Sequence, residues 1–352
     1  MNIGIVTVWY SENYGSFWQA KSLGDYLKKE ASVFYMNSIN KESSHSLKYL
    51  SSVLLKNVLK GNLKDSLKII KKYREFDVLL DEFEIIDMNN LDNIDLLVFG
   101  SDTLWDMKSK YFRESSNLFW GIDFDTRKVA YAPSVANSSV VDLENMGFVQ
   151  KALKQFCDLS VRDDYSKNVI ENFTKLTVHK VCDPTLLFEK DHYIRLSKPI
   201  NKENYILVYL FDDIDNEDSI EIIKYAKSES LRIIALGRKL NWADITVYPD
   251  PYEFLSYFNN AEIVITNTFH GAIFSLIFER NFISYGKNKN KVKHLLNDYN
   301  LSGRLKDTGQ STSDLLNSEI DYENIRFIKD KIRLSSQKFI VDSIFEDSVE
   351  YE

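Results

Sequence analysis

The stretch Glu262-Ile263-Val264-Ile265-Thr266-Asn267-Thr268-Phe269-His270-Gly271-Ala272 joins an apolar, β-branched run to the start of an apolar helical pattern. The run predicts a buried strand over 262–266, and Gly271-Ala272 begins the predicted helix. A strand that leads directly into a helix is the repeating unit of a parallel α/β sheet. Because ligands bind at the carboxyl ends of such strands, the imidazole in the turn becomes a candidate functional group.

The same alternation of strand and helix patterns recurs along the chain. Helix periodicity covers 19–29, 219–228 and 251–259. We therefore predict an α/β protein with one domain over 1–190, a second over 200–312, and a helical tail over 313–352 that packs back on the first domain. The other predicted strands are Ile3–Val8, Leu96–Phe99, Lys128–Tyr131, Leu159–Val161, Tyr205–Leu210 and Leu231–Leu236.

Composition excludes several classes of protein. The chain has 352 residues, of which 44% are hydrophobic and 27% charged, which excludes a disordered, collagen-like or coiled-coil chain. A net charge of -8 disfavours nucleic-acid binding. The two cysteines form no recognisable disulfide framework and favour a reducing, cytoplasmic setting. No basic residue precedes Lys21, so we expect no secretory signal, and Ile263–Phe278 is too short and polar to span a bilayer.

Residues 53–74 form a basic amphipathic pattern, with lysines at 56, 60, 64 and 68 between Leu and Val. One interpretation is that this segment makes peripheral contact with an anionic membrane surface, at the inner face of the membrane. The other is a core-packing helix with a solvated lysine face. The sequence leaves both open.

The motifs of several common chemistries are absent. The chain has no Gly-rich dinucleotide or P-loop motif, no His-Glu-x-x-His and no Cys-x-x-Cys, and its five histidines are scattered. We therefore expect neither a metal site nor a bound cofactor.

Four segments at strand ends carry polar residues that could act on a ligand. Asn13-Tyr14-Gly15-Ser16 could bring a helix N-terminus to an anion, or form an ordinary turn and cap. Asp102 could serve as a base or bind a hydroxyl, or cap a helix. Arg162 closes an apolar strand and could pair with nearby acids or hold a phosphate or carboxylate. His270 suits acid–base chemistry or hydrogen bonding to an anion.

Taken in order, these segments resemble the polysaccharide pyruvyl transferase family. The resemblance covers most of residues 1–305, and the ordered set is more specific than any single motif. The motifs that carry it are Asn13-Tyr14-Gly15-Ser16, Trp18-Gln19-Ala20, Gly100 to Trp105, Tyr131-Ala132-Pro133-Ser134, Ser160 to Asp164, Asp183 to Leu187, Phe254-Leu255, Ala261–Thr266, Thr268-Phe269-His270-Gly271 and Leu301 to Arg304.

The resemblance implies two facing Rossmann-like domains, similar to the GT-B arrangement, in a bacterial polymer-synthesis enzyme. It also implies that the enolpyruvyl group of phosphoenolpyruvate, a co-substrate, is moved onto a sugar or lipid-linked oligosaccharide as a cyclic ketal. Its expected catalytic residues are His270 and Asp102. The expected donor-binding residues, mostly from the second domain, are Arg162, Arg304, Lys287, Thr268, Asn267 and Gly271, with Lys291 as an alternative lysine. The expected acceptor-binding residues, in the first domain, are Asn13, Tyr14, Gly15, Ser16, Gln19, Ser101 and Trp105.

The sequence departs from the family pattern at one position. Characterised members often carry an arginine where this chain has Thr268, and that arginine is thought to hold phosphoenolpyruvate. Two other functions therefore stay open: a GT-B-type nucleotide-sugar glycosyltransferase, and a non-catalytic binding protein of a polysaccharide-synthesis complex.

Overall fold

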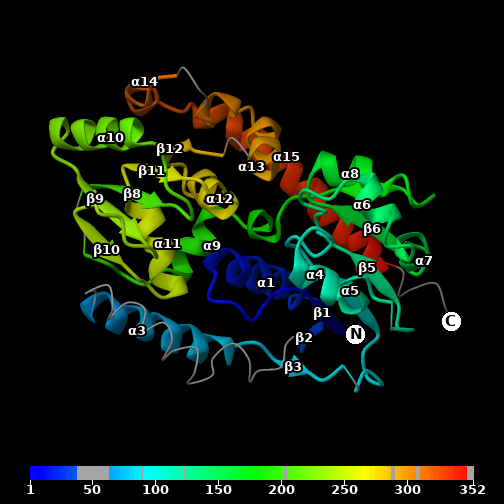
Figure 1. The fold of residues 1–352 in the computed structure, drawn as a ribbon. Coiled ribbons are helices and arrows are strands. Elements are labelled where there is room, and N and C mark those ends of the chain that lie inside the picture. Colours follow the sequence, from blue (N-terminus) through cyan, green and yellow to red (C-terminus); the bar gives the residue numbers. More distant parts are fainter. Residues whose placement is uncertain are drawn as a thin grey trace.

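A computed structural model describes residues 1–37, 63–88, 90–122, 124–201, 204–286, 290–306 and 310–346. Two parallel sheets lie side by side, each flanked by helices (Figure 1). The predicted α/β class, with two facing Rossmann-like domains, is confirmed.

The first sheet has seven parallel strands in the order β3-β2-β1-β4-β5-β6-β7. Its strands are β1 (Asn2–Val6), β2 (Ser32–Met36), β3 (Ile85–Ile86), β4 (Leu96–Phe99), β5 (Lys128–Ala130), β6 (Asp158–Val161) and β7 (Val178–Lys180). The helices along this part of the chain are α1 (Tyr14–Leu27), α3 (Leu63–Leu80), α4 (Lys110–Glu114), α5 (Ser116–Phe119), α6 (Val140–Glu144), α7 (Val149–Leu153), α8 (Asp164–Ile170) and the 3₁₀ turn η1 (Pro184–Leu187).

The second sheet has five parallel strands in the order β10-β9-β8-β11-β12. They are β8 (Tyr205–Tyr209), β9 (Arg232–Leu236), β10 (Ile245–Val247), β11 (Ile263–Thr266) and β12 (Asn281–Ser284). The remaining helices are α9 (Lys190–Leu196), α10 (Asn216–Ser228), α11 (Pro251–Asn260), α12 (Phe269–Phe278), α13 (Asn290–Asp298), η2 (Ser302–Arg304), α14 (Thr312–Asn317), α15 (Tyr322–Ile340) and the π-helical η3 (Val341–Phe345).

Each strand predicted from the sequence coincides with a strand of the structure to within two residues at either end. The first helix begins earlier than predicted, at Tyr14, because the Asn13 side chain accepts a hydrogen bond from the Gly15 N–H and caps it. Five strands of the structure were not predicted: β2, β3, β7, β10 and β12. Of these, β3, β7 and β10 have only two or three residues, which carry too little periodicity.

The two domains share one aromatic core. Tyr14 on α1 stacks on Phe254 of the second domain with ring centroids 4.5 Å apart, and its hydroxyl donates to the Pro249 carbonyl at 2.7 Å. The Trp18 indole donates to the Pro251 carbonyl at 3.1 Å. Helix α1 is therefore part of the first domain but packs against aromatic residues of the second domain. The burial of this apolar surface holds the two domains together.

The C-terminal helix α15 crosses back to the first domain (Figure 1). The Ser336 hydroxyl accepts from the backbone N–H of Cys182 at 2.8 Å, and Gln337 donates to the Leu187 carbonyl at 2.9 Å. This contact places one face of α15 beside the carboxyl end of β7.

Only part of the basic segment 53–74 lies within the described residues. From 66 onward, α3 buries Phe76 and Leu80 against the aromatic core and leaves Leu67 and Lys68 exposed. The core-packing interpretation fits the buried face, and the membrane contact stays a prediction. In the described ranges, no helix has the length and apolar character needed to cross a bilayer.

Because the aromatic core is shared, we expect the two domains to unfold together. Phe254→Ala removes a fully buried ring and should lower the free energy of unfolding by about 3–5 kcal/mol. Urea unfolding followed by both tryptophan fluorescence and circular dichroism should show one transition moved to lower urea. Ile220→Ala, at an exposed α10 position, should change stability by less than about 0.5 kcal/mol. Two separate transitions in Phe254→Ala would contradict the shared core.

Candidate active site

The strand order reverses at one place in each sheet. In the first sheet, β1 and β4 are neighbours, but the strand after β1 is added on one side of this pair and the strand after β4 on the other. In the second sheet, the same holds for β8 and β11. A crevice for a ligand forms outside the carboxyl ends of the strands at such a point. Here the loops after β1 and β4 face the loops after β8 and β11.

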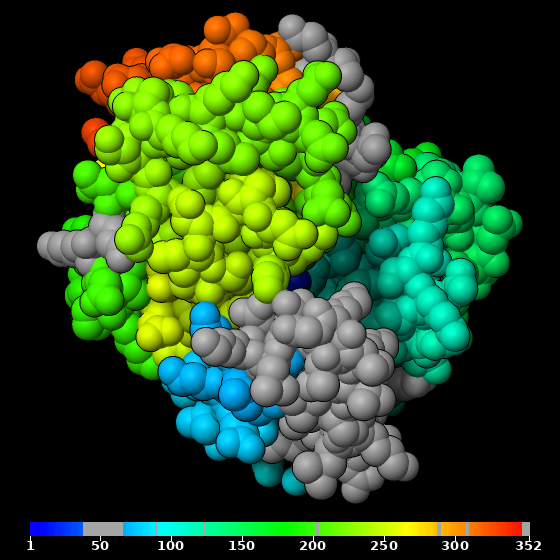
Figure 2. All heavy atoms as spheres, turned by 60° about the vertical axis from the view of Figure 1, so that its left-hand side comes forward, coloured from blue at the N-terminus to red at the C-terminus, as the bar shows by residue number. Residues whose placement is uncertain are grey.

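A cleft of about 170 Å³ lies between these facing loops. Figure 2 shows the hollow between the two domains, with blue atoms of the N-terminal segment at its base. The first domain lines the cleft with Asn13, Ser16, Asp102 and Arg162, and the second lines it with Tyr209, Phe211, Asn267, Thr268, Phe269, His270 and Lys291.

His270 sits on the first turn of α12 and packs directly onto the first turn of α1. A Cβ atom built on Gly15 would lie 2.1 Å from Nδ1 of His270, closer than any real contact. The other ring nitrogen, Nε2, is buried and lies 3.6 Å from Oδ2 of Asp183. A glycine at position 15 is therefore what leaves room for the imidazole between the two domains.

Arg162 and Asp183 form a buried ion pair behind the histidine. The Nη1 atom of Arg162 lies 3.0 Å from Oδ2 of Asp183 and 3.3 Å from the Ser101 hydroxyl. The guanidinium also stacks on the Phe269 ring, 4.2 Å from its centroid. Its Nε and Nη2 atoms are buried and have no hydrogen-bond partner among the described residues. Unpaired buried donors are costly, so these two point to a missing acceptor such as a ligand oxygen.

Asp102 has a strained backbone. Its φ of 90° lies in the left-handed region, which a non-glycine residue seldom adopts. Its Oδ2 accepts from the Ser16 hydroxyl at 3.0 Å, and its Oδ1 accepts from the Thr103 N–H at 2.7 Å. Strain of this kind gathers at functional sites, where the surrounding structure maintains it.

The charges in the cleft keep both acids ionised. Burial alone would raise the pKa of Asp102, but Arg162, Lys291 and His270 outweigh it, and the pKa lies below its usual range. Burial also opposes ionisation of Asp183, yet His270, Arg162 and a hydrogen bond from Thr185 hold the pKa of this carboxyl well below normal. The cleft is thus lined by one carboxylate, a guanidinium, an ammonium and an imidazole, and the carboxylate of Asp183 lies behind the guanidinium and the imidazole.

Several predicted site residues hold the cleft in shape. The Thr268 hydroxyl caps α12 by accepting from the Gly271 N–H at 2.8 Å, and Asn13 caps α1 in the same way. Asn267 accepts from the Phe211 N–H and donates to the Asp212 carbonyl. Gln19 is fully buried and bonds Thr7 and the carbonyls of Val8 and Ser16. Ser101 donates to Asp183 at 3.2 Å.

Three other predicted residues do not line the cleft and lie in buried packing. Arg304 is buried and donates to Phe282, Asn281, Leu315 and Ser318, which ties η2 to β12 and α14. Trp105 is fully buried and stacks on Trp120 at 4.8 Å, and Tyr14 is buried in the aromatic core. These contacts do not support the predicted donor role of Arg304 or the predicted acceptor roles of Trp105 and Tyr14. Lys287 lies outside the described residues.

Sequence reasoning missed some residues that the structure brings to the cleft or directly behind it. Asp183 was quoted only as part of a motif, and Phe269, Tyr209 and Phe211 were given no role. The signal for Asp183 was an aspartate directly before a proline and an apolar run, which marks the start of a helical turn at a strand end. Among the described residues, no group of three or more His, Cys, Asp or Glu side chains could hold a metal ion.

The ion pair should make stability depend on pH. The pKa of Asp183 is lowered on folding, so its ionised form stabilises the protein above about pH 4, and this contribution is lost as the pH falls. Asp183→Asn leaves Arg162 buried and unpaired and should cost about 3–5 kcal/mol at pH 7, measured by urea unfolding. The difference from the wild type should shrink below pH 4. Glu171→Gln, which breaks an exposed pair with Lys167, should cost less than about 1 kcal/mol. An equal loss in both variants would contradict the role of Asp183.

Comparison with solved structures supports the GT-B-like arrangement. The UDP-GlcNAc 2-epimerase from Neisseria meningitidis, bound to UDP-GlcNAc, matches with a TM-score of 0.53 and 11% identity, over 98% of this chain and 100% of that one. The UDP-GlcNAc 2-epimerase from Methanocaldococcus jannaschii matches with a TM-score of 0.50 and 12% identity, over 96% of this chain and 99% of that one. A putative UDP-N-acetylglucosamine 2-epimerase from Listeria monocytogenes matches with a TM-score of 0.50 and 10% identity, over 100% of this chain and 97% of that one. At these identities the likeness shows the fold alone.

The family is shown by a sequence comparison. The family model for polysaccharide pyruvyl transferase matches residues 13–287. That span begins at the cap of α1 and includes Asp102, Arg162, Asp183 and His270. No curated protein sequence matches the chain. The resemblance read from the motifs is thereby confirmed, and the chain belongs to the polysaccharide pyruvyl transferase family.

Proposed function

We propose that this protein transfers the enolpyruvyl group of phosphoenolpyruvate to two hydroxyls of a sugar, forming a cyclic ketal and releasing phosphate. The observation that carries the proposal is the buried Arg162, which lines the small cleft and has two N–H groups without a hydrogen-bond partner among the described residues. A planar guanidinium meets phosphate and carboxylate oxygens with paired hydrogen bonds, and phosphoenolpyruvate carries both groups.

Arg162 can supply the positive charge of the family arginine that is absent at position 268. Position 268 holds a threonine, but the guanidinium of Arg162 lies over the ring of the adjacent Phe269. The positive charge thus reaches the same turn of α12 from the first domain. Lys291 adds a second cation, with its ammonium 5.9 Å from the centroid of the same ring. The N-termini of α1 and α12, which both border the cleft, further favour an anion there.

His270 is the proposed acid. A proton from its imidazolium goes to the methylene carbon of phosphoenolpyruvate, which leaves positive charge on C2. Asp183, 3.6 Å from Nε2, stabilises the imidazolium and fixes the ring. One sugar hydroxyl attacks C2, the bond from C2 to the phosphate oxygen breaks, and phosphate leaves with the electron pair. The second hydroxyl then closes the ketal.

Asp102 is the proposed base. Its carboxylate, ionised and held by Ser16, accepts the proton of an attacking hydroxyl. Of the two hydroxyl protons, one replaces the proton that His270 gave to the methylene carbon and the other leaves on phosphate, so the reaction is balanced without an added acid or base.

Donor binding tests the role of Arg162. Calorimetric titration with phosphoenolpyruvate should give saturable binding to the wild type, and Arg162→Lys should weaken the Kd about tenfold or more, because lysine keeps the charge but loses the fork. Arg195→Lys, at an exposed position on α9, should leave the Kd unchanged. Equal affinity of the wild type and Arg162→Lys would reject the assignment. Binding of nucleotide sugars in place of phosphoenolpyruvate would favour a glycosyltransferase.

Turnover tests His270. Phosphate release from phosphoenolpyruvate, measured with a panel of hexosides that have free O4 and O6, should fall about 10²–10⁴-fold in His270→Ala while the donor Kd changes little. Near-normal turnover would reject His270 as the acid. Donor binding without phosphate release in the wild type, whatever the hexoside, would favour a non-catalytic binding protein.

The packing of Gly15 gives a separate prediction. In Gly15→Ala the new methyl group occupies the place of Nδ1 and must displace the imidazole, so turnover should fall by about tenfold or more. Gly303→Ala, where the new methyl group meets nothing within 4 Å, should keep full turnover. Thermal unfolding of both variants shows whether the fold is kept. Unchanged turnover in Gly15→Ala would contradict the tight placement of His270.

A further inference from the structure

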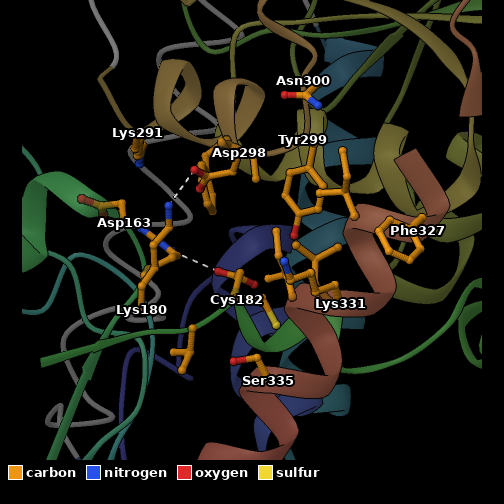
Figure 3. Close-up of a pocket in the computed structure, with 18 residues that line it drawn as sticks. Asp163, Lys180, Cys182, Lys291, Asp298, Tyr299, Asn300, Phe327, Lys331 and Ser335 are labelled. Atoms are coloured by element: carbon orange, nitrogen blue, oxygen red, sulfur yellow. Dashed lines mark hydrogen bonds and ion pairs between the residues drawn. The ribbon is translucent and has the colours of Figure 1, made fainter. Parts of the chain in front are cut away.

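A second and larger cavity adjoins the cleft. It measures about 520 Å³ and lies between the carboxyl ends of β6 and β7, helix α13 and helix α15 (Figure 3). Arg162, Phe269 and Lys291 line both this cavity and the smaller cleft. Cavities of this size hold ligands with many atoms, whereas about 170 Å³ suits a small anion. The donor therefore does not need the larger cavity.

One face of α15 forms the outer wall of this cavity. Phe327, Lys331 and Ser335 follow each other at intervals of four residues, and all three line the cavity while remaining exposed (Figure 3). The Phe327 side chain is 72% exposed. A flat apolar ring beside an ammonium and a hydroxyl matches the surface of a pyranose, which has an apolar C–H face and a rim of hydroxyls.

The inner wall supplies further polar groups. Tyr299 is almost fully buried, and its ring points into the cavity (Figure 3). Across the part of the chain that the structure describes, nothing hydrogen-bonds its hydroxyl. Asp298 lines the cavity and accepts a hydrogen bond from Lys180 through Oδ1 at 2.6 Å. These groups and the exposed face of α15 line the same space.

We propose that this cavity binds the hexose of the acceptor, with Phe327 against the sugar ring and Tyr299 and Asp298 at its hydroxyls. The assignment rests on the proposed function, because the shared wall of Arg162, Phe269 and Lys291 brings the reacting hydroxyls to the donor. Gln19 and Trp105, two of the predicted acceptor residues, are fully buried and line neither space.

Direct binding of 4-nitrophenyl glucoside, galactoside and mannoside tests this site, measured by calorimetry with and without phosphoenolpyruvate. The wild type should bind at least one hexoside, and Phe327→Ala should weaken that Kd about fivefold or more. Its Kd for phosphoenolpyruvate should stay unchanged. Leu334→Ala is the matched control, since Leu334 is also exposed on α15 but does not line the cavity. 4-Nitrophenol alone should not compete with the hexoside.

Three outcomes would overturn the acceptor site: no hexoside bound under either condition, equal affinity in Phe327→Ala and the wild type, or full competition by 4-nitrophenol. Failure of the donor proposal has a different signature, because phosphoenolpyruvate then shows no binding while the hexoside still depends on Phe327. That result would support a sugar-binding site in a protein with another donor.

Discussion

The contact between the first turns of α1 and α12 is the constraint on which the rest of the site depends. Helix α1 is part of the first sheet, yet Tyr14 and Trp18 are buried against the second domain. This packing presses Gly15 against the His270 ring. The imidazole is thereby held by both domains, and any movement of one domain against the other would also move the proposed acid relative to Asp102 and Arg162.

The electrostatics follow from this closeness. Arg162 comes from the first sheet, but its guanidinium lies over Phe269 in the second domain, and Asp183 touches both Arg162 and His270. One carboxylate thus balances the guanidinium and also contacts the imidazole in a buried region, where charge interactions are strong. The balance is incomplete, because two N–H groups of Arg162 stay unpaired among the described residues. The energetic cost of unpaired buried donors is expected at a site where a ligand supplies the missing hydrogen-bond acceptors.

In the proposed reaction, the small cleft would hold the donor and the larger cavity the acceptor sugar. A compact anion needs fixed cations and little volume, whereas a sugar needs area, an aromatic surface and many weak hydrogen bonds. The two spaces share one wall, to which the first domain contributes Arg162 and the second contributes Phe269 and Lys291. In this arrangement, the C-terminal helix α15 is part of the site and not only a support for the first sheet.

The sequence by itself determined the α/β class, the positions of most strands and the polar residues at their carboxyl ends, because these depend on local periodicity and on turn chemistry. Only the tertiary structure decided what each of those residues contacts. Thr268 and Asn13 became caps, Trp105 and Arg304 were taken up by buried packing and hydrogen bonds, and Asp183 joined the site. The physical reason is that a polar side chain can satisfy either the backbone beside it or a group far away in the chain, and only the packing of the two domains determines which partner lies within reach.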